Sequence, residues 1–387
     1  MRVRIQKRGL IPALIVAVVG TGLLYLGATE GLVAWNSSRA EPQGGVGALP
    51  SVVENAPPSV PTTDEYGPLG AVSLVFAGTE VRDGLFGSLD DPWIAVASNG
   101  GGYRALKAPR LPAAGPGVMT VSHDGRLLAW PSEAGVVVYD AVTGDARTLE
   151  IEGVDHVGGF SPDSGMVLAY AGQLSVVDVE TGEVVATAEA EPETLRRTAW
   201  RADSGGVDFV SGDELTTIAV PAGDVSTQPT DVPEQASLAW SPGGDQLISL
   251  REMDGVKRLF LSQMGRDGTL SDGKQVSTDG ISLDRLIGFS GDRTVAVVAY
   301  LLESGSLERI LDIPLDGRSA TDLTTLPSVG ENWVSTDTLA IASDNLVAGS
   351  VDYEGQLWPW SYTARLVACA LFAFFLFGLY VTRRPRR

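Results

Sequence analysis

The stretch FSPDSGMVLAY, Phe160 to Tyr170, combines an aromatic residue, a tight polar turn and an apolar run. In such a turn Pro presets φ, Asp hydrogen-bonds its own backbone, and Gly accepts backbone angles that other residues avoid. The apolar run after the turn is typical of a β-strand. Nearly the same phrase returns 80 residues later as WSPGGDQLISL, Trp240 to Leu250. The repetition indicates that one supersecondary unit recurs along the chain.

Weaker copies of this phrase extend the repeat in both directions. Aligned on the apolar residue before the turn, the copies begin at Phe86, Val121, Phe160, Trp200, Trp240, Phe289 and Trp333. Their spacings are 35, 39, 40, 40, 49 and 44 residues. Most copies are followed 22 to 28 residues later by a second turn with Gly, as in VTGD at Gly144 and ETGE at Gly182. A period of about 40 residues with four short strands is typical of propeller blades.

The two turns predict the layout of a blade whose strands are named a to d from the axis outward. The aromatic residue or Val should end strand a and pack between blades, the SPDG turn should join a to b, and the TG turn should join c to d. The strand Ala71–Gly78 precedes the first copy, so we expect it to complete the last blade as its outermost strand and close the ring. The fold class expected is all-β, a single propeller with seven blades preferred and six or eight also possible.

The SPDG-type turns and TG hairpins over residues 71–357 resemble those of the WD-repeat and TolB-like β-propeller superfamily. The resemblance implies a bacterial propeller used as an interaction platform, because many roles have been grafted onto this architecture. The chain departs from the WD pattern in having no WD dipeptide in any repeat, and Asp155-His156 is only faintly similar to the usual Gly-His.

Two apolar segments flank the repeats. Residues 9–29 follow a tail, 1–8, that carries four basic residues, and residues 358–382 precede the basic tail RRPRR, 383–387. Each segment is long enough to cross about 30 Å of hydrocarbon as a helix. A signal peptide is the alternative for the first segment, and a buried core helix for the second. The basic tails predict a transmembrane helix at each end of the propeller, with both termini cytoplasmic and the propeller outside.

The part between the two segments is strongly acidic. Residues 30–70, rich in Pro and Gly, are expected to form a linker to the extracytoplasmic propeller of residues 71–357. Without the eight basic residues of the tails, 20 Lys and Arg face 48 Asp and Glu, a formal charge of −28. Such a charge argues against nucleic acid and favours cationic partners if the chain has any, with solubility as the alternative explanation of the charge. The single cysteine, Cys369, lies in the second segment, so we expect no disulfide in the propeller.

Strand parity predicts two distinct faces of the ring. The SPDG and TG turns should share one face with both membrane tethers, and the b–c and d–a loops should form the other face. That second face is expected to be an acidic docking surface for a basic protein segment or a divalent cation, with a merely solvated rim as the alternative. The candidate residues on its loops are Glu152, Asp155, Glu189, Glu191, Glu193, Asp231, Glu234, Glu252, Asp254, Glu303 and Glu331.

The sequence offers little for catalysis. Two histidines, His123 in a turn and His156 near the start of a strand, cannot build a His-rich metal site. The segment DGTLSDG, 267–273, lacks the final Glu of a calcium loop, and no GxSxG motif is present. We therefore expect no catalytic residue, no cofactor and no bound metal.

The leading hypothesis is a non-catalytic, membrane-tethered extracytoplasmic platform that binds another protein of the bacterial envelope or a cationic ligand. One alternative is a propeller enzyme, a lyase or hydrolase, with carboxylates in the central channel. Convergent Asp, Arg and Tyr side chains with strongly shifted pKa values at the channel mouth would favour that enzyme. Another alternative is an accessory subunit of a membrane complex.

Overall fold

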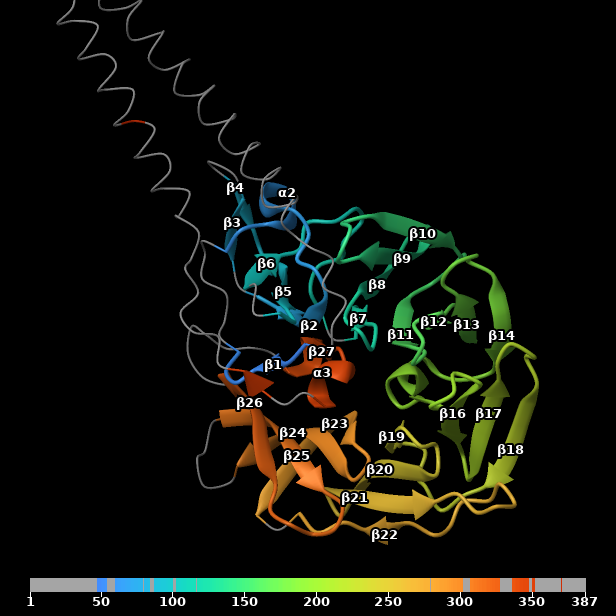
Figure 1. Ribbon diagram of the computed structural model, residues 1–387. Coiled ribbons are helices and arrows are strands. Elements are labelled where there is room, and N and C mark those ends of the chain that lie inside the picture. Colours follow the sequence, from blue (N-terminus) through green and yellow to red (C-terminus); the bar gives the residue numbers. More distant parts are fainter. Residues whose placement is uncertain are drawn as a thin grey trace, which may run out of the picture.

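Six four-stranded sheets stand around one axis as the blades of a propeller (Figure 1). The structure is a computed structural model that describes residues 47–53, 60–78, 80–83, 87–99, 102–115, 117–278, 280–301, 307–327, 336–347, 350–351 and 370. Strand order within each sheet follows the chain from the axis outward, except in the blade that closes the ring. The prediction of an all-β, single propeller is confirmed.

The blades are numbered from the one that contains the first described long strand. Blade 1 consists of β27 (Ala340–Ile341), β2 (Val72–Ala77), β5 (Trp93–Ala97) and β6 (Tyr103–Ala105). Blade 2 consists of β7 (Thr120–Val121), β8 (Leu127–Ser132), β9 (Gly135–Asp140) and β10 (Ala146–Glu150). Blade 3 consists of β11 (His156–Phe160), β12 (Met166–Tyr170), β13 (Leu174–Asp178) and β14 (Val184–Ala188).

The other three blades follow the same plan. Blade 4 consists of β15 (Ala199–Trp200), β16 (Gly206–Ser211), β17 (Glu214–Ala219) and β18 (Val225–Pro229). Blade 5 consists of β19 (Ser237–Trp240), β20 (Gln246–Met253), β21 (Val256–Gln263) and β22 (Lys274–Gln275). Blade 6 consists of β23 (Ile281–Gly291), β24 (Thr294–Leu301), β25 (Leu307–Pro314) and β26 (Thr321–Pro327).

Short elements accompany the blades. The helical ones are α2 (Thr63–Tyr66), the 3₁₀ turns η2 (Pro192–Arg196) and η3 (Thr336–Thr338), and α3 (Asp344–Val347). The strands β3 (Val81–Asp83) and β4 (Gly87–Leu89) pair with each other, and β1 (Leu49–Pro50) pairs in parallel with β28 (Ser350–Val351). In Figure 1, α3 and β27 lie near the axis of the ring.

The repeated phrase has the predicted place in five blades. Val121, Phe160, Trp200 and Trp240 end β7, β11, β15 and β19, and Phe289 lies near the end of β23. Phe160 is buried among side chains of blades 2 and 3, and Trp240 among those of blades 4 and 5, so the anchors pack between blades as expected. Trp200 is only partly buried. The SPDG-type turns join strands a and b, and the TG turns join c and d.

The preference for seven blades was wrong. The regions expected to form the first and the last blade share one sheet, because β2, β5 and β6 come from the former and β27 from the latter. The expected anchors Phe86 and Trp333 lie outside the described residues, and the chain around Phe86 is flanked by β3 and β4, which lie between β2 and β5 in sequence. Among the described residues neither region supplies four strands to one sheet, and the two together make one blade.

The predicted position of the closing strand was also wrong. Residues 72–77 form the second strand of blade 1, with Leu74 opposite Ile341 on one side and opposite Val96 on the other. All side chains of β2 from Val72 to Phe76 are buried, which fits a strand with packed faces and not an outermost strand. The two ends of the array do close the ring together, but the C-terminal end supplies the innermost strand. Strands b and d begin on the same face of the ring, so the new position of residues 72–77 does not move the start of this strand to the other face. The tethers lie outside the described residues, and the face from which they leave stays a prediction.

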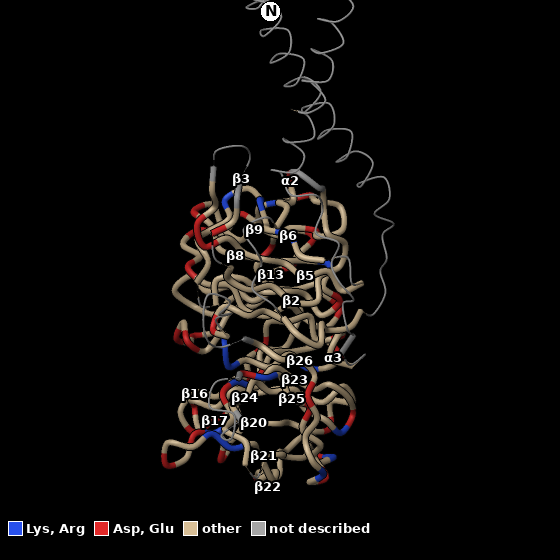
Figure 2. The backbone as a smooth tube through the Cα atoms, turned by 90° about the vertical axis from the view of Figure 1, so that its left-hand side faces the viewer, with Lys and Arg blue, Asp and Glu red and all other residues tan. Residues whose placement is uncertain are grey.

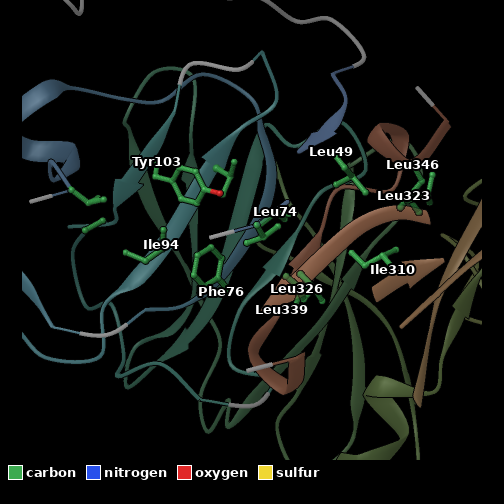
Figure 3. Packing of buried hydrophobic residues seen from close by; sticks show 14 of the residues in the cluster. Leu49, Leu74, Phe76, Ile94, Tyr103, Ile310, Leu323, Leu326, Leu339 and Leu346 are labelled. Carbon is green, nitrogen blue, oxygen red and sulfur yellow. The ribbon is translucent and has the colours of Figure 1, made fainter. Parts of the chain in front are cut away.

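At the point where the ring closes, one apolar cluster joins residues from the two ends of the repeat array (Figure 3). Leu49, Leu74 and Phe76 pack with Ile310 and Leu326 of blade 6 and with Leu346 of α3, all at most 2% exposed. Burial of about 25 cal/mol per Å² of apolar surface makes such a cluster the main attraction between the first and last blades.

The flanking membrane helices are not found in the part of the chain that the structure describes. The expected spans, residues 9–29 and 358–382, lie outside the described residues except for Ala370, and no described helix is long and apolar enough to cross a membrane. On that finding the predicted fold class with a transmembrane helix at each end, and the predicted two-pass localisation, do not stand. The basic tails also lie outside the described residues.

Candidate functional site

A groove lies between blades 2 and 3 on the face that carries the SPDG and TG turns. It encloses about 660 Å³ and has sixteen lining residues from the a–b and c–d turns of both blades. We call it groove 2–3. Its charged lining residues are Asp124, Arg126, Asp140, Asp145, Arg147, Asp163, Asp178 and Glu180. Six carboxylates and two guanidinium groups give this lining a formal charge of −4.

Two of these carboxylates are held by the repeated turn between strands a and b. In blade 3 the Ser161 hydroxyl donates to Oδ1 of Asp163 at 2.6 Å, and the Gly165 N–H donates to the same oxygen at 3.1 Å. In blade 2 the hydroxyl of Ser122 donates to Oδ1 of Asp124 at the same distance, 2.6 Å. The turn chemistry that defines the repeat therefore also fixes one acid per blade at the groove.

The TG turns between strands c and d supply two more carboxylates. Oδ1 of Asp140 accepts the N–H groups of Val142 and Thr143 at 2.9 and 3.1 Å, and Oδ1 of Asp178 accepts the N–H of Thr181 at 2.7 Å. Strands alternate in direction, so the end of strand c and the end of strand a reach the same face. The two kinds of turn meet there at the boundary between two blades.

The basic residues of the groove are partly engaged. The Nε and Nη2 atoms of Arg126 donate to Oδ2 of Asp140 at 2.9 and 2.8 Å, and this hydrogen bonding raises the pKa of Arg126. Nη1 of Arg147 donates to the backbone oxygen of Glu180 at 3.2 Å. One guanidinium group therefore neutralises Asp140, and the other bridges the two blades.

Two acids of the groove, Asp163 and Asp178, have lowered pKa values. Partial burial opposes the ionisation of Asp163, but the hydrogen bonds from Ser161 and Gly165 outweigh it and lower the pKa of the carboxyl. The N–H of Thr181 is the main cause of the lowered pKa of Asp178. A carboxyl with a lowered pKa is a poor proton donor or acceptor near pH 7, so Asp163 and Asp178 are better suited to binding a cation than to acid–base catalysis.

The acids are spread along the groove. Among the described residues no three His, Cys, Asp or Glu side chains converge closely enough to hold a metal ion. Figure 2 shows the ring edge-on, with Asp and Glu at the turns on both edges. The arrangement offers several separate negative charges to a ligand with several separate positive charges.

The sequence placed its candidate acids on the opposite face, and none of them lines groove 2–3. The described ones are exposed and lie between strands b and c or between strands d and a, as parity predicted, except that Glu252 lies within β20; these are Glu152, Asp155, Glu189, Glu191, Glu193, Asp231, Glu234, Glu252 and Asp254. Glu303 and Glu331 lie outside the described residues. The pKa of Asp231 is lowered, chiefly by the hydrogen bond from Arg251, whose Nη1 lies 2.9 Å from Oδ2 of Asp231. That the loops form a docking face stays a prediction.

Sequence reasoning treated the acids of groove 2–3 as turn residues and nothing more. The signal that could have found them is the Ser-x-Asp spacing, present in both VSHDG at Val121 and FSPDS at Phe160. Strand parity places all SPDG-type turns on one face of the ring. Two neighbouring blades with a Ser-x-Asp turn therefore predict two acids at the boundary between these blades.

A second cluster of titratable groups lies in blade 6. Burial raises the pKa of Tyr300 to about 12 and that of Glu308 above its usual range, and it lowers the pKa of Arg285. Oε2 of Glu308 is buried without a hydrogen-bond partner among the described residues. Convergence of this kind was the predicted mark of an enzyme. With only 7% of Glu308 exposed, however, a substrate has no direct access to the carboxyl.

No family model and no curated protein matches the chain. Solved structures with a similar fold include a protein assigned as TolB from Agrobacterium tumefaciens, at 12% identity and a TM-score of 0.44 over 60% of this chain and 88% of that one. TolB from Acinetobacter baumannii has 12% identity and a TM-score of 0.45 over 70% and 66%. Hydrazine synthase of Kuenenia stuttgartiensis has 15% identity and a TM-score of 0.41 over 57% and 68%. These similarities concern the fold alone. The number of blades and the residues of the site come from the sheets and side chains described above.

Proposed function

We propose that the chain is a non-catalytic propeller that binds a basic segment of a partner protein in groove 2–3. The observation that carries this proposal is the groove itself, with six carboxylates against two guanidinium groups at a boundary between blades. A lining of one dominant sign attracts and orients a ligand of the opposite sign. The chain as a whole carries a formal charge of −20, so long-range attraction acts in the same direction.

The shape of the site favours a polypeptide over a single ion. The acids come from four separate turns, and no three potential metal ligands converge among the described residues. A hollow of about 660 Å³ lies within the range of ligand sites, about 300 to 1,000 Å³. A segment with two or three Lys or Arg side chains can pair with acids of both blades at once. That the partner belongs to the cell envelope stays a prediction.

The test uses the full-length chain and a hexalysine peptide as the probe. The five methionines can be labelled with ¹³C in their methyl groups, and Met166 lines groove 2–3. We expect the Met166 signal to shift with peptide concentration and to reach saturation. A hexaglutamate peptide should leave it unmoved.

A pair of double variants separates the groove from the overall charge. Asp163→Asn/Asp178→Asn removes two charges of the groove and should weaken hexalysine binding about tenfold, which is about 1.4 kcal/mol. Asp203→Asn/Asp213→Asn removes two charges from blade 4, outside the groove, and should leave the affinity within about twofold. Equal losses in both double variants would show that hexalysine responds to net charge alone, and the proposed site would be wrong.

A further inference from the structure

Blade 4 departs from the turn pattern of its neighbours at two positions. Where blades 2, 3 and 5 open the a–b turn with a serine, blade 4 has Arg201. Those serines are Ser122, Ser161 and Ser241. In each of these blades the first residue of the turn donates its N–H to the backbone oxygen five residues later, and in blade 4 this bond joins Arg201 to Gly206. When the blades are compared on this bond, Asp208 stands where the other blades have apolar side chains. Those side chains are Ala129, Leu168 and Ile248.

Arg201 and Asp208, the two residues that differ, belong to one hydrogen-bond network around the buried carboxylate of Asp208. The Nε of Arg201 donates to Oδ2 of Asp208 at 2.9 Å, and its Nη2 donates to Oδ1 at 3.3 Å. Nε1 of Trp240, from blade 5, donates to Oδ2 of Asp208 at 2.7 Å, and the Thr217 hydroxyl donates to Oδ1. Asp208 is completely buried. Three blades do without such a pair, and burying charges is costly, so propeller folding alone does not require it.

The network holds a guanidinium group at the surface in a fixed position. The side chain of Arg201 is 37% exposed, and its Cζ lies 5.9 Å from the centre of the Trp240 ring. Above it is a second hollow of about 480 Å³, on the same face as groove 2–3 but at the boundary of blades 4 and 5. We call it pocket 4–5. Its lining consists of Arg201, Ala202, Asp203, Trp240, Pro242, Gly243, Gly244, Met264 and Gly268.

The lining of pocket 4–5 is electrically balanced. Its two charged lining residues are of opposite sign, Arg201 and Asp203, and the carboxylate of Asp203 accepts the N–H of Gly205 at 2.9 Å. A cation would meet the guanidinium group, and an anion would meet Asp203. Besides Asp203, the larger side chains of the lining are the guanidinium group of Arg201, the indole of Trp240 and the flexible thioether of Met264.

We propose that pocket 4–5 binds an uncharged aromatic side chain of a partner polypeptide. Aromatic rings stack on guanidinium planes and make favourable contacts with methionine sulfur. A pocket of this volume admits a tyrosine, phenylalanine or tryptophan side chain. This proposal rests on pocket 4–5 alone and does not depend on groove 2–3.

The experiment titrates the full-length chain with N-acetyl-tyrosinamide, a neutral aromatic probe. Met264 lines pocket 4–5 and Met166 lines groove 2–3, so two methyl signals of one sample report the two sites separately. We expect Met264 to shift and saturate while Met166 stays still. N-acetyl-lysinamide and acetate should not move Met264.

A variant that fills the pocket provides the control for position. Ala202→Phe adds a ring to the lining, and the equivalent turn position holds His123, Pro162 or Pro242 in the other blades, so a large side chain is tolerated there. It should weaken the probe at least about tenfold. Val225→Phe adds the same ring to the exposed strand β18 of blade 4 and should leave binding unchanged. Both variants leave Arg201 and Asp208 in place.

Each outcome bears on one proposal only. An unmoved Met264 signal, an equal shift with N-acetyl-lysinamide, or unchanged binding in Ala202→Phe would overturn the aromatic pocket, whatever hexalysine does at Met166. Saturable binding that Ala202→Phe removes and Val225→Phe keeps would establish it, even if hexalysine fails to bind.

Discussion

Groove 2–3 and pocket 4–5 occupy the same position in the repeat and place their charges differently. In blade 2, Arg126 pairs with Asp140 at 2.8 Å with its side chain 56% exposed. In blade 4, Arg201 pairs with Asp208 at 2.9 Å, and the carboxylate is completely buried. The first arrangement leaves a surplus of acids at the surface, and the second leaves a balanced surface over a buried ion pair.

The difference shows that, in one repeated fold, the charged residues of one blade boundary can serve binding while those of another serve stability. Exposed pairs contribute about 0 to 1 kcal/mol to stability, so the pairing of Arg126 with Asp140 adds little to the fold. A buried pair is different, because loss of one partner leaves an uncompensated charge in the interior. Blade 4 thereby depends on a pair that its neighbours lack.

The largest expected effect breaks the buried pair. Arg201→Ser gives blade 4 the serine of blades 2 and 3 and leaves Asp208 buried with only Thr217 and Trp240 as hydrogen-bond donors. We expect the free energy of unfolding in urea to fall by about 3–5 kcal/mol. Arg126→Ser, the matched change in blade 2, should cost at most about 1 kcal/mol.

A double variant then tests the cause of that loss. Arg201→Ser/Asp208→Leu copies both residues of blade 3, and it should recover most of the stability because no charge stays buried. If the double variant is as unstable as Arg201→Ser, the loss comes from packing around Arg201 and not from the charge of Asp208. Trp240 loses its acceptor in the double variant, so the recovery should be incomplete by about 1–3 kcal/mol.

A smaller expected effect is a difference in how salt changes the binding affinity at the two sites. Raising NaCl from about 50 mM to about 500 mM should weaken hexalysine binding at groove 2–3 about tenfold, because screening acts on exposed charges. The same change should alter the affinity of N-acetyl-tyrosinamide for pocket 4–5 by less than about twofold, since no net charge is involved. The methyl shifts of Met166 and Met264 measure both affinities. A similar salt response at the two sites would remove the electrostatic distinction between them.

Local turn chemistry made the blades predictable. Each polar turn after strand a is specified within about five residues, so the ends of β7, β11, β15 and β19 could be placed from the sequence. Closure depends instead on Leu74 and Ile341, which are far apart in the chain and carry no turn signal. The clue was the nearly continuous apolar run VSLVFA of β2, which indicates a strand buried on both faces.

The site was less predictable than the fold. The acids of groove 2–3 belong to the repeat, so they were explained by turn formation and not considered further. The opposite applies to pocket 4–5, where Arg201 and Asp208 deviate from the repeat. A departure at two positions, seven residues apart in sequence, indicates a pair once the strand alternation is known. That Trp240 of the next blade joins the pair follows only from the packing of blades.

The smallest effect concerns the second residue of the turn, which is His123 in blade 2 and Ala202 in blade 4. Nδ1 of His123 lies 2.6 Å from Oγ of Ser343, and the backbone oxygen of His123 accepts the N–H of Asp344. The turn of blade 2 thus holds the segment that closes the ring. Burial is the main cause of the lowered pKa of His123, and it outweighs the opposing carboxylates of Asp344 and Asp124.

The lowered pKa of His123 gives stability a definite pH dependence. Above about pH 6.5 the imidazole is neutral in both folded and unfolded chains and adds no slope. As the pH falls below this value the unfolded chain takes up a proton and the folded chain does not, so the free energy of unfolding decreases, by at most about 1.4 kcal/mol per pH unit.

His123→Gln should remove this part of the slope when urea unfolding is compared at pH 7.5 and 5.5, values that lie about one unit either side of the unperturbed pKa. His156→Gln, at an exposed position on β11, should leave the slope as it is. If both variants keep the slope of the parent chain, the imidazole of His123 is not the group that weakens the fold in acid, and the acid sensitivity must come from carboxyls whose pKa is lowered in the folded chain, such as Asp163.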